Sequence, residues 1–303
     1  MLKSRSFHAV ILMNEKLKFS GGLFRIIFSA IIISGGSFFI FSKIQKNNKN
    51  NLTSQKYEIK AIGQNQNEVM LNVNYLAQLM ELSSSKPSNL FLFDEKKAEE
   101  SLLSSPVIKS AKVKKMKPDC LFVDYVLRKP VAYLYDFENT AIDEEGHIFP
   151  VEPFFPPQDL CKFYLGIGDF TGYEKVDCKR VLYALDIYDK LKSSGFADLV
   201  KIKVLDTSRL ELQSYGKREI LLYIEEELKV QKKQKDRVVV FPIVLRLALS
   251  NYLEQIGNYL SLRLKILKDY DNQIKDIDLD DSVVKFKPKT IDLRLSKLAF
   301  IDQ

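Results

Sequence analysis

Residues that could carry out chemistry are few and scattered in this chain of 303 residues. The chain contains two histidines, His8 and His147, and three cysteines, Cys120, Cys161 and Cys178. Metal binding requires clustered ligands and nucleophilic catalysis requires a nucleophile beside a base, and the sequence shows neither pattern. It also lacks a Gly-rich phosphate loop, a Gly-x-Ser-x-Gly elbow and a His-Glu-x-x-His motif. We therefore predict a non-catalytic protein without a cofactor or metal.

The cysteine count limits disulfide formation. An odd number of cysteines leaves at least one thiol over, so a complete disulfide framework is excluded. One bridge between two of the three cysteines stays open as an alternative. Three small buried side chains are the favoured interpretation.

Binding chemistry is a better candidate than catalysis, and two groups of residues could supply it. One group is a basic patch on or beside a single predicted strand: Lys112, Lys114, Lys115 and Lys117. These lysines either protect an edge strand from aggregation or form a docking patch for an acidic partner. The other group is a short, β-prone segment near the end of the chain: Val283, Val284, Lys285, Phe286 and Lys287. An edge strand there would leave backbone groups that a strand of another chain could pair.

Hydrophobic spacing and helix breakers predict the helices and strands that carry these residues. The first set of predicted elements is a strand at 57–62, a helix that begins at Asn72 or Asn74, a helix that begins after Asp94 and ends before Pro106, and two strands at 110–116 and 121–127. The second set is a hairpin at 140–142 and 147–151, a helix that ends near Gly195, strands at 199–205, 210–215 and 219–224, a long helix over 249–267, and a strand-like segment at 274–287. No element is assigned to the charged segment 225–237.

One apolar stretch is long enough to suggest a membrane anchor. Residues 26–42 contain no charged side chain, and with their apolar flanks they predict a transmembrane helix over 23–44, because a helix rises about 1.5 Å per residue across a core of about 30 Å. A cleaved signal peptide ending near Gly35 and Gly36 is the alternative. Lysine and arginine are balanced on the two sides, so we expect the amino terminus inside because that is the ordinary outcome for a lone early anchor.

The net charge of +7 does not indicate nucleic-acid binding. Residues 1–50 hold eight of the 46 basic residues and one of the 39 acidic residues, so residues 51–303 are balanced at 38 of each. The basic excess therefore flanks the predicted anchor, where it can meet anionic lipid. A neutral remainder lacks the charge that phosphate binding requires.

Four short sequence segments, in this order, resemble those of the FtsQ/DivIB family of bacterial cell-division proteins. They are Pro106–Val113, where a proline ends a helix and a strand follows; Lys117–Leu121, a hairpin turn; Arg128–Ala132, a junction between modules; and Ile142–Phe149, an Asp-x-x-Gly hairpin. They follow an apolar stretch and a polar linker, as in that family. The resemblance covers residues 20–150 well and the remainder loosely.

The resemblance implies an α+β architecture with a single N-terminal transmembrane helix. The implied segments are a cytoplasmic tail (1–22), the transmembrane helix (23–44), a linker (45–56), a POTRA domain of order β-α-α-β-β (57–129), a mixed α/β domain with an antiparallel sheet (130–290) and a C-terminal tail (291–303). The expected location is the inner membrane at the division site, as a single-pass type II protein with the bulk of the chain periplasmic.

The implied function is a divisome scaffold that recruits and positions other division membrane proteins for septum formation. In such proteins the final strand of the β domain accepts a strand from FtsB, which is paired with FtsL, and the resemblance carries that role to 283–287. The alternatives are a POTRA-containing envelope export or assembly factor and a membrane-tethered envelope enzyme. Neither nucleic acid nor a cofactor is expected as a partner.

Overall fold

The computed structural model describes residues 28–29, 32–46, 49–66, 69–83, 85–168, 172–232, 235–275, 283–295 and 297–302. The chain forms two compact units. The first unit combines residues up to 65 with 72–101 and 112–124, and the second combines 66–71 and 102–111 with the chain from 125 onward.

Residues 32–44 of the predicted anchor are helical, and residues 45–46 and 49–53 of the predicted linker are helical as well. Among the described residues, no helix combines the length and the apolar character that crossing a membrane requires. The predicted transmembrane segment 23–44 includes residues 23–27, 30 and 31, and these lie outside the described residues, as does the predicted tail 1–22. The anchor therefore stays a prediction.

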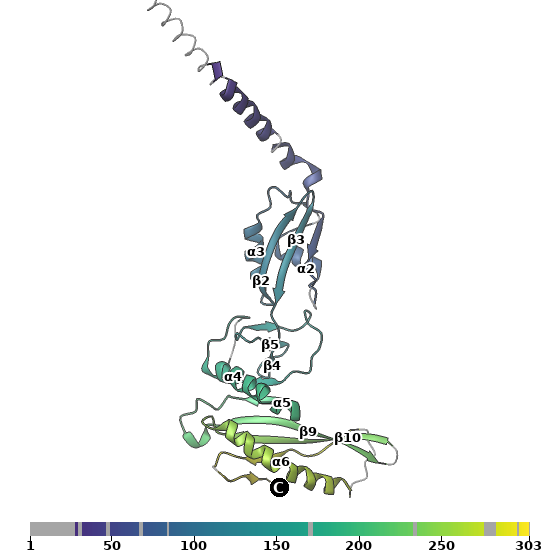
Figure 1. Ribbon diagram of the computed structural model, residues 1–303, viewed down its shortest axis with the longest axis vertical. Coiled ribbons are helices and arrows are strands. Elements are labelled where there is room, and N and C mark those ends of the chain that lie inside the picture. The colour runs from purple at the N-terminus through teal and green to yellow at the C-terminus, as the bar shows by residue number, and fades with distance from the viewer. Residues whose placement is uncertain are drawn as a thin grey trace, which may run out of the picture. The chain divides into compact units, whose positions relative to one another are not determined.

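The segment 55–127, most of which belongs to the first unit, has the predicted order β-α-α-β-β (Figure 1). Its elements are the 3-10 helix η1 (Gln55–Tyr57), β1 (Ala61–Gln64), α2 (Val73–Leu79), α3 (Glu95–Leu103), β2 (Ile108–Met116) and β3 (Cys120–Leu127). The strands form one sheet in the order β1-β3-β2, in which β1 runs parallel to β3. The first strand begins later than predicted, because Gln55–Tyr57 forms η1 and Glu58 forms an isolated bridge with Asn89.

Both helices of this unit begin where the sequence predicts. The Asn72 side chain accepts a hydrogen bond from the Asn74 backbone N–H at 2.8 Å. The Asp94 carboxylate accepts hydrogen bonds from the N–H groups of Lys96 and Lys97 at 3.0 and 3.2 Å. These caps satisfy N–H groups that the first turn of a helix leaves without partners.

The second unit is a mixed sheet covered by helices. Its elements are β4 (Ala132–Leu134), β5 (Thr140–Ile142), β6 (Ile148–Pro150), β7 (Lys162–Tyr164), α4 (Lys179–Ser193), α5 (Phe196–Leu199), β8 (Lys201–Asp206), the 3-10 helix η2 (Tyr215–Lys217), β9 (Ile220–Lys232), β10 (Lys235–Leu247), α6 (Tyr252–Lys275), β11 (Val283–Lys285), β12 (Lys289–Asp292) and β13 (Phe300–Ile301). The strand order is β13-β12-β10-β9-β8-β7-β4-β5-β6, with β11 also paired to β10. The pairs β4–β7, β7–β8, β10–β11 and β10–β12 are parallel. The α+β class is confirmed, and the sheet is mixed rather than antiparallel.

Residues 225–232 and 235–237 of the charged segment belong to a long antiparallel hairpin. Strands β9 and β10 pair continuously from Ile220↔Leu247 to Lys232↔Lys235 (Figure 1). Strand β10 is not among the predicted elements, although Val238, Val239 and Val240 favour a strand. The predicted strand at 210–215 is wrong, because the chain turns there and then forms η2.

The core of the second unit lies on one face of this sheet. Alternate residues of β9 and β10 point into it, and α4 and α6 contribute one helical face each. The buried residues include Leu222, Ile224, Val239, Phe241, Ile243 and Leu245 from the hairpin, Val181, Ala184, Ile187 and Leu191 from α4, and Ile256, Tyr259, Ile266 and Tyr270 from α6. Apolar side chains at every second position of the strands and on one face of each helix therefore pack together in one layer.

The sheet continues into residues for which a C-terminal tail is predicted. Strand β12 crosses the predicted boundary at residue 290, and β13 pairs with it. Ile291 and Leu293 are only 1% and 2% exposed. The segment after residue 290 is therefore part of the folded unit rather than a projecting tail.

Candidate partner-binding edges and a polar cluster

Strand β11, which carries part of the predicted partner-binding segment, lies at an edge of the sheet. Strands β11 and β12 follow one another along the same side of β10, at Val238–Val240 and Ile243–Arg246 respectively. The outer side of β12 is covered by β13. Among the described residues, β11 pairs with β10 alone. Its outer side therefore presents backbone groups to which a further strand could add.

From Val284 to Lys287 the side chains alternate between the core and the solvent. The Phe286 ring centroid lies 4.6 Å from that of Phe241, which stacks on Tyr270 at 3.9 Å. The Phe286 N–H donates to the Val240 carbonyl oxygen at 3.0 Å. Lys285 is exposed, and its Nζ lies 2.5 Å from a Glu225 carboxylate oxygen. The aromatic contacts fix the segment against β10, while its alternate residues face outward.

The four lysines of the predicted basic patch do not form one uniform group. Lys112 and Lys114 are exposed on β2. Lys115 is half-buried, with its Nζ 3.9 Å from a Glu95 carboxylate oxygen. Lys117 lies in the turn after β2, and its Nζ is 5.4 Å from the Phe91 ring centroid. Lys112, Lys114 and Lys117 are therefore exposed, and Lys115 and Lys117 make local contacts.

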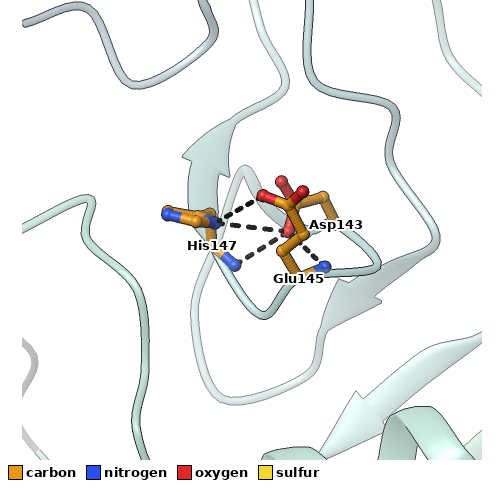
Figure 2. A group of neighbouring side chains, drawn as sticks. All are labelled: Asp143, Glu145 and His147. Atoms are coloured by element: carbon orange, nitrogen blue, oxygen red, sulfur yellow. Dashed lines mark hydrogen bonds and ion pairs between the residues drawn. The ribbon is translucent and has the colours of Figure 1, made fainter. Parts of the chain in front are cut away.

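A third feature, which was not predicted, is a polar cluster at the turn between β5 and β6. Figure 2 shows Asp143, Glu145 and His147 gathered at this turn. One Asp143 carboxylate oxygen accepts the backbone N–H groups of Glu145 and His147, both at 2.9 Å. The other accepts an Arg128 guanidinium N–H at 2.8 Å. The Asp-x-x-Gly spacing is the signal for the turn, and the fold adds Arg128.

This cluster fits a structural role better than a metal site. One ligand atom from each of Asp143, Glu145 and His147 lies within 4.8 Å of the others. Both Asp143 oxygens already accept hydrogen bonds, and the Lys109 ammonium lies 2.8 Å from a Glu145 oxygen. The hydrogen bond from Lys109 lowers the pKa of Glu145. A metal cation would have to compete with two protein cations, so we interpret the cluster as holding the turn in place.

The cysteines form no disulfide. Cys120, Cys161 and Cys178 are all free, so the open alternative of one bridge is not realised in the structure. Cys161 is buried, and its burial raises the pKa of its thiol to about 12. Such a thiol stays protonated at neutral pH, which makes it a poor nucleophile.

The comparisons with known proteins identify part of the first unit. A search of curated proteins found no match to this chain. Residues 76–124 match the family model described as "POTRA domain, FtsQ-type". POTRA domains are in general non-catalytic modules for protein–protein interaction. The matched region contains α3, β2 and parts of α2 and β3, so the chain contains a POTRA domain of the FtsQ type.

Proposed function

We propose that this protein is a non-catalytic bitopic scaffold of the bacterial cell-division machinery, which recruits and positions other division membrane proteins for septum formation. The observation that carries this proposal is the FtsQ-type POTRA domain at residues 76–124. The second unit has a mixed sheet in which β11, among the described residues, pairs on one side only, and this supports a role in holding partners. The order of a POTRA domain followed by a sheet domain also agrees with the resemblance to FtsQ/DivIB.

A membrane anchor at 23–44 is part of the proposal. Its support is the uncharged run at 26–42 and the balance of charge in the remainder of the chain. In this arrangement residues 1–22 lie in the cytoplasm and the two units lie in the periplasm, at the division site. The partners would then be other inner-membrane division proteins, of the FtsB and FtsL kind.

We assign partner capture to the edge of β11 and the residues that follow it, 283–287. A partner strand would pair with outward-facing backbone groups, which alternate along a strand. The Phe286 N–H faces β10, so the Lys285 N–H faces the opposite side. Lys285 is therefore a residue whose backbone N–H a partner strand could use.

The test replaces Lys285 with proline and, as a matched control, with alanine. Lys285→Pro removes the outward N–H, whereas Lys285→Ala removes the same side chain and its ion pair with Glu225 but keeps the N–H. We expect the proline variant to lose at least tenfold in affinity for the organism's FtsB-like protein, since one lost hydrogen bond and a disturbed strand together exceed about 1.4 kcal/mol. Alanine should have little effect. Affinity is measured by titration of the purified full-length proteins.

Localisation separates this function from its alternatives. A fluorescent fusion should gather at mid-cell before septum closure. Uniform staining of the cell rim, together with unchanged FtsB-like binding by Lys285→Pro, would contradict the proposal and favour an envelope export or assembly factor.

A further inference from the structure

The outer edge of β2, in the first unit, is covered by carboxylates rather than by a strand. Strand β2 lies at one end of the sheet order β1-β3-β2. The backbone N–H of Val113 donates to a Glu99 carboxylate oxygen at 2.9 Å, and that of Lys115 donates to a Glu95 carboxylate oxygen at 3.0 Å. Both glutamates come from α3. Two side chains of a helix therefore take the place that an added strand would have.

The spacing of the two glutamates along α3 matches the spacing of the two N–H groups along β2. Glu95 and Glu99 are four residues apart on a helix, which is a rise of about 6 Å, and Val113 and Lys115 are two residues apart on a strand, which is about 6.6 Å. Glu95 bonds to the later residue of β2 and Glu99 to the earlier one, so α3 runs antiparallel to β2. The carboxylates thus follow the spacing of the N–H groups along this edge.

The charge of the same edge favours acidic groups. Lys112, Lys114, Lys115 and Lys117 lie within six residues. Among the described residues, Lys112 and Lys114 take part in no ion pair. A second copy of β2 would place its own lysines against these, and like charges on paired strands are destabilising. A segment rich in glutamate or aspartate would instead find both backbone donors and cations.

We propose that the outer edge of β2 binds an acidic, extended segment of a partner protein, and that Glu95 and Glu99 occupy this edge until the partner displaces them. The edge recognises carboxylates in both states, first from α3 and then from the partner. This surface is separate from 283–287, so the proposal does not depend on strand capture by the second unit.

The first experiment measures binding of a fluorescent octapeptide of alternating glutamate and threonine to the full-length protein. The variant Glu95→Gln/Glu99→Gln keeps acceptors of similar size but removes the charge that strengthens their hydrogen bonds. We expect it to bind the peptide roughly tenfold more tightly than the parent does. The matched control is Glu100→Gln, the exposed neighbouring glutamate on α3, which should change the affinity by about twofold at most.

The second experiment reverses the charge of the exposed lysines while the glutamates stay. Lys112→Glu/Lys114→Glu should weaken peptide binding at least tenfold, and Lys96→Glu, on the exposed side of α3, serves as the control for overall charge. An octapeptide of alternating lysine and threonine should not bind the parent or the glutamine variant.

Hydrogen exchange tests the displacement itself. The amide protons of Val113 and Lys115 should exchange faster in Glu95→Gln/Glu99→Gln than in the parent, and saturating acidic peptide should slow them again. The proposal would be overturned if Glu100→Gln raised the peptide affinity as much as the double variant does, or if the double variant left that affinity unchanged. It would also be overturned if the peptide slowed hydrogen exchange elsewhere but not at residues 112–116. Retained thermal unfolding of the double variant confirms that it is folded.

Discussion

Buried carboxylates in the second unit are stabilised by specific cations. Glu226 lies on β9 with only 2% of its surface exposed, and it accepts two hydrogen bonds from the Arg263 guanidinium at 2.6 and 2.8 Å. The Tyr259 hydroxyl donates to the same carboxylate at 2.8 Å. Burial is the main cause that raises the pKa of Tyr259, and the hydrogen bond to Glu226 is the main cause that raises the pKa of Arg263. This cluster attaches α6 to β9 across the charged part of the hairpin.

Removal of the arginine should therefore destabilise the second unit more than removal of the whole ion pair. Arg263→Met leaves a buried carboxylate without its cation, which we expect to lower the free energy of unfolding by about 3–5 kcal/mol. Glu226→Gln/Arg263→Met should recover part of that loss, because no uncompensated charge remains. Urea denaturation measures both, and Lys268→Ala on the exposed side of α6 is the control. A larger loss in the double variant would contradict this account.

At the scale of elements, a network of ion pairs attaches the last strands to the sheet. Asp292 of β12 accepts hydrogen bonds from the Arg294 guanidinium at 2.7 to 3.2 Å. Arg246 and Arg294 also contact the buried Glu219 at 2.8 and 3.4 Å. Burial alone would raise the pKa of Asp292, but the hydrogen bonds and charge of Arg294 outweigh it and lower the pKa. The deprotonated carboxylate is therefore the form that the folded state favours.

This lowered pKa predicts a pH dependence of stability. A carboxyl group with a lower pKa in the folded state stabilises it at pH values above the ordinary aspartate pKa of about 3.9, and this contribution is lost as the pH falls through the folded value. Asp292→Asn should reduce the free energy of unfolding by about 1–2 kcal/mol at pH 7, with the difference from the parent vanishing in strong acid. Urea titrations of the parent and of Asp292→Asn, from strong acid to pH 7, measure this difference in the free energy of unfolding. Asp302→Asn, at an exposed position, should show no such trend.

At the scale of the whole molecule, the end of the chain is part of the second unit's core. Ile291 and Leu293 are nearly fully buried, whereas Leu295, Leu298 and Phe300 are more than half exposed. Residues 289–293, which include β12, and the segment after them should therefore differ sharply in their importance for folding.

Two truncations test this difference. A chain that ends at Pro288 loses Ile291 and Leu293, which we expect to cost about 3–6 kcal/mol from their burial alone. A chain that ends at Arg294 keeps both residues and should unfold within a few degrees of the parent. Thermal unfolding followed by circular dichroism distinguishes them. Equal unfolding temperatures for the two truncated chains would show that 289–294 is a dispensable tail.

The sequence by itself determined the features that depend on near neighbours in the chain. The caps at Asn72 and Asp94, the end of a helix before Pro106 and the hairpin around Gly146 follow from local backbone chemistry, and the structure contains all of them. The order of elements in the POTRA domain follows from hydrophobic spacing. These features needed no knowledge of distant contacts.

Only the tertiary structure decided the features that depend on distant partners. A charged run such as 225–237 is typical of an exposed loop. Residues 225–232 nevertheless form the end of β9, because β10 pairs along their whole length and Arg263, far along the chain, neutralises Glu226. Glu95 and Glu99 likewise look like ordinary helix-surface residues until β2 is placed beside them. Spacing along a chain specifies which faces are apolar, but pairing across a sheet and the compensation of buried charge are long-range interactions, so the fold alone determines them.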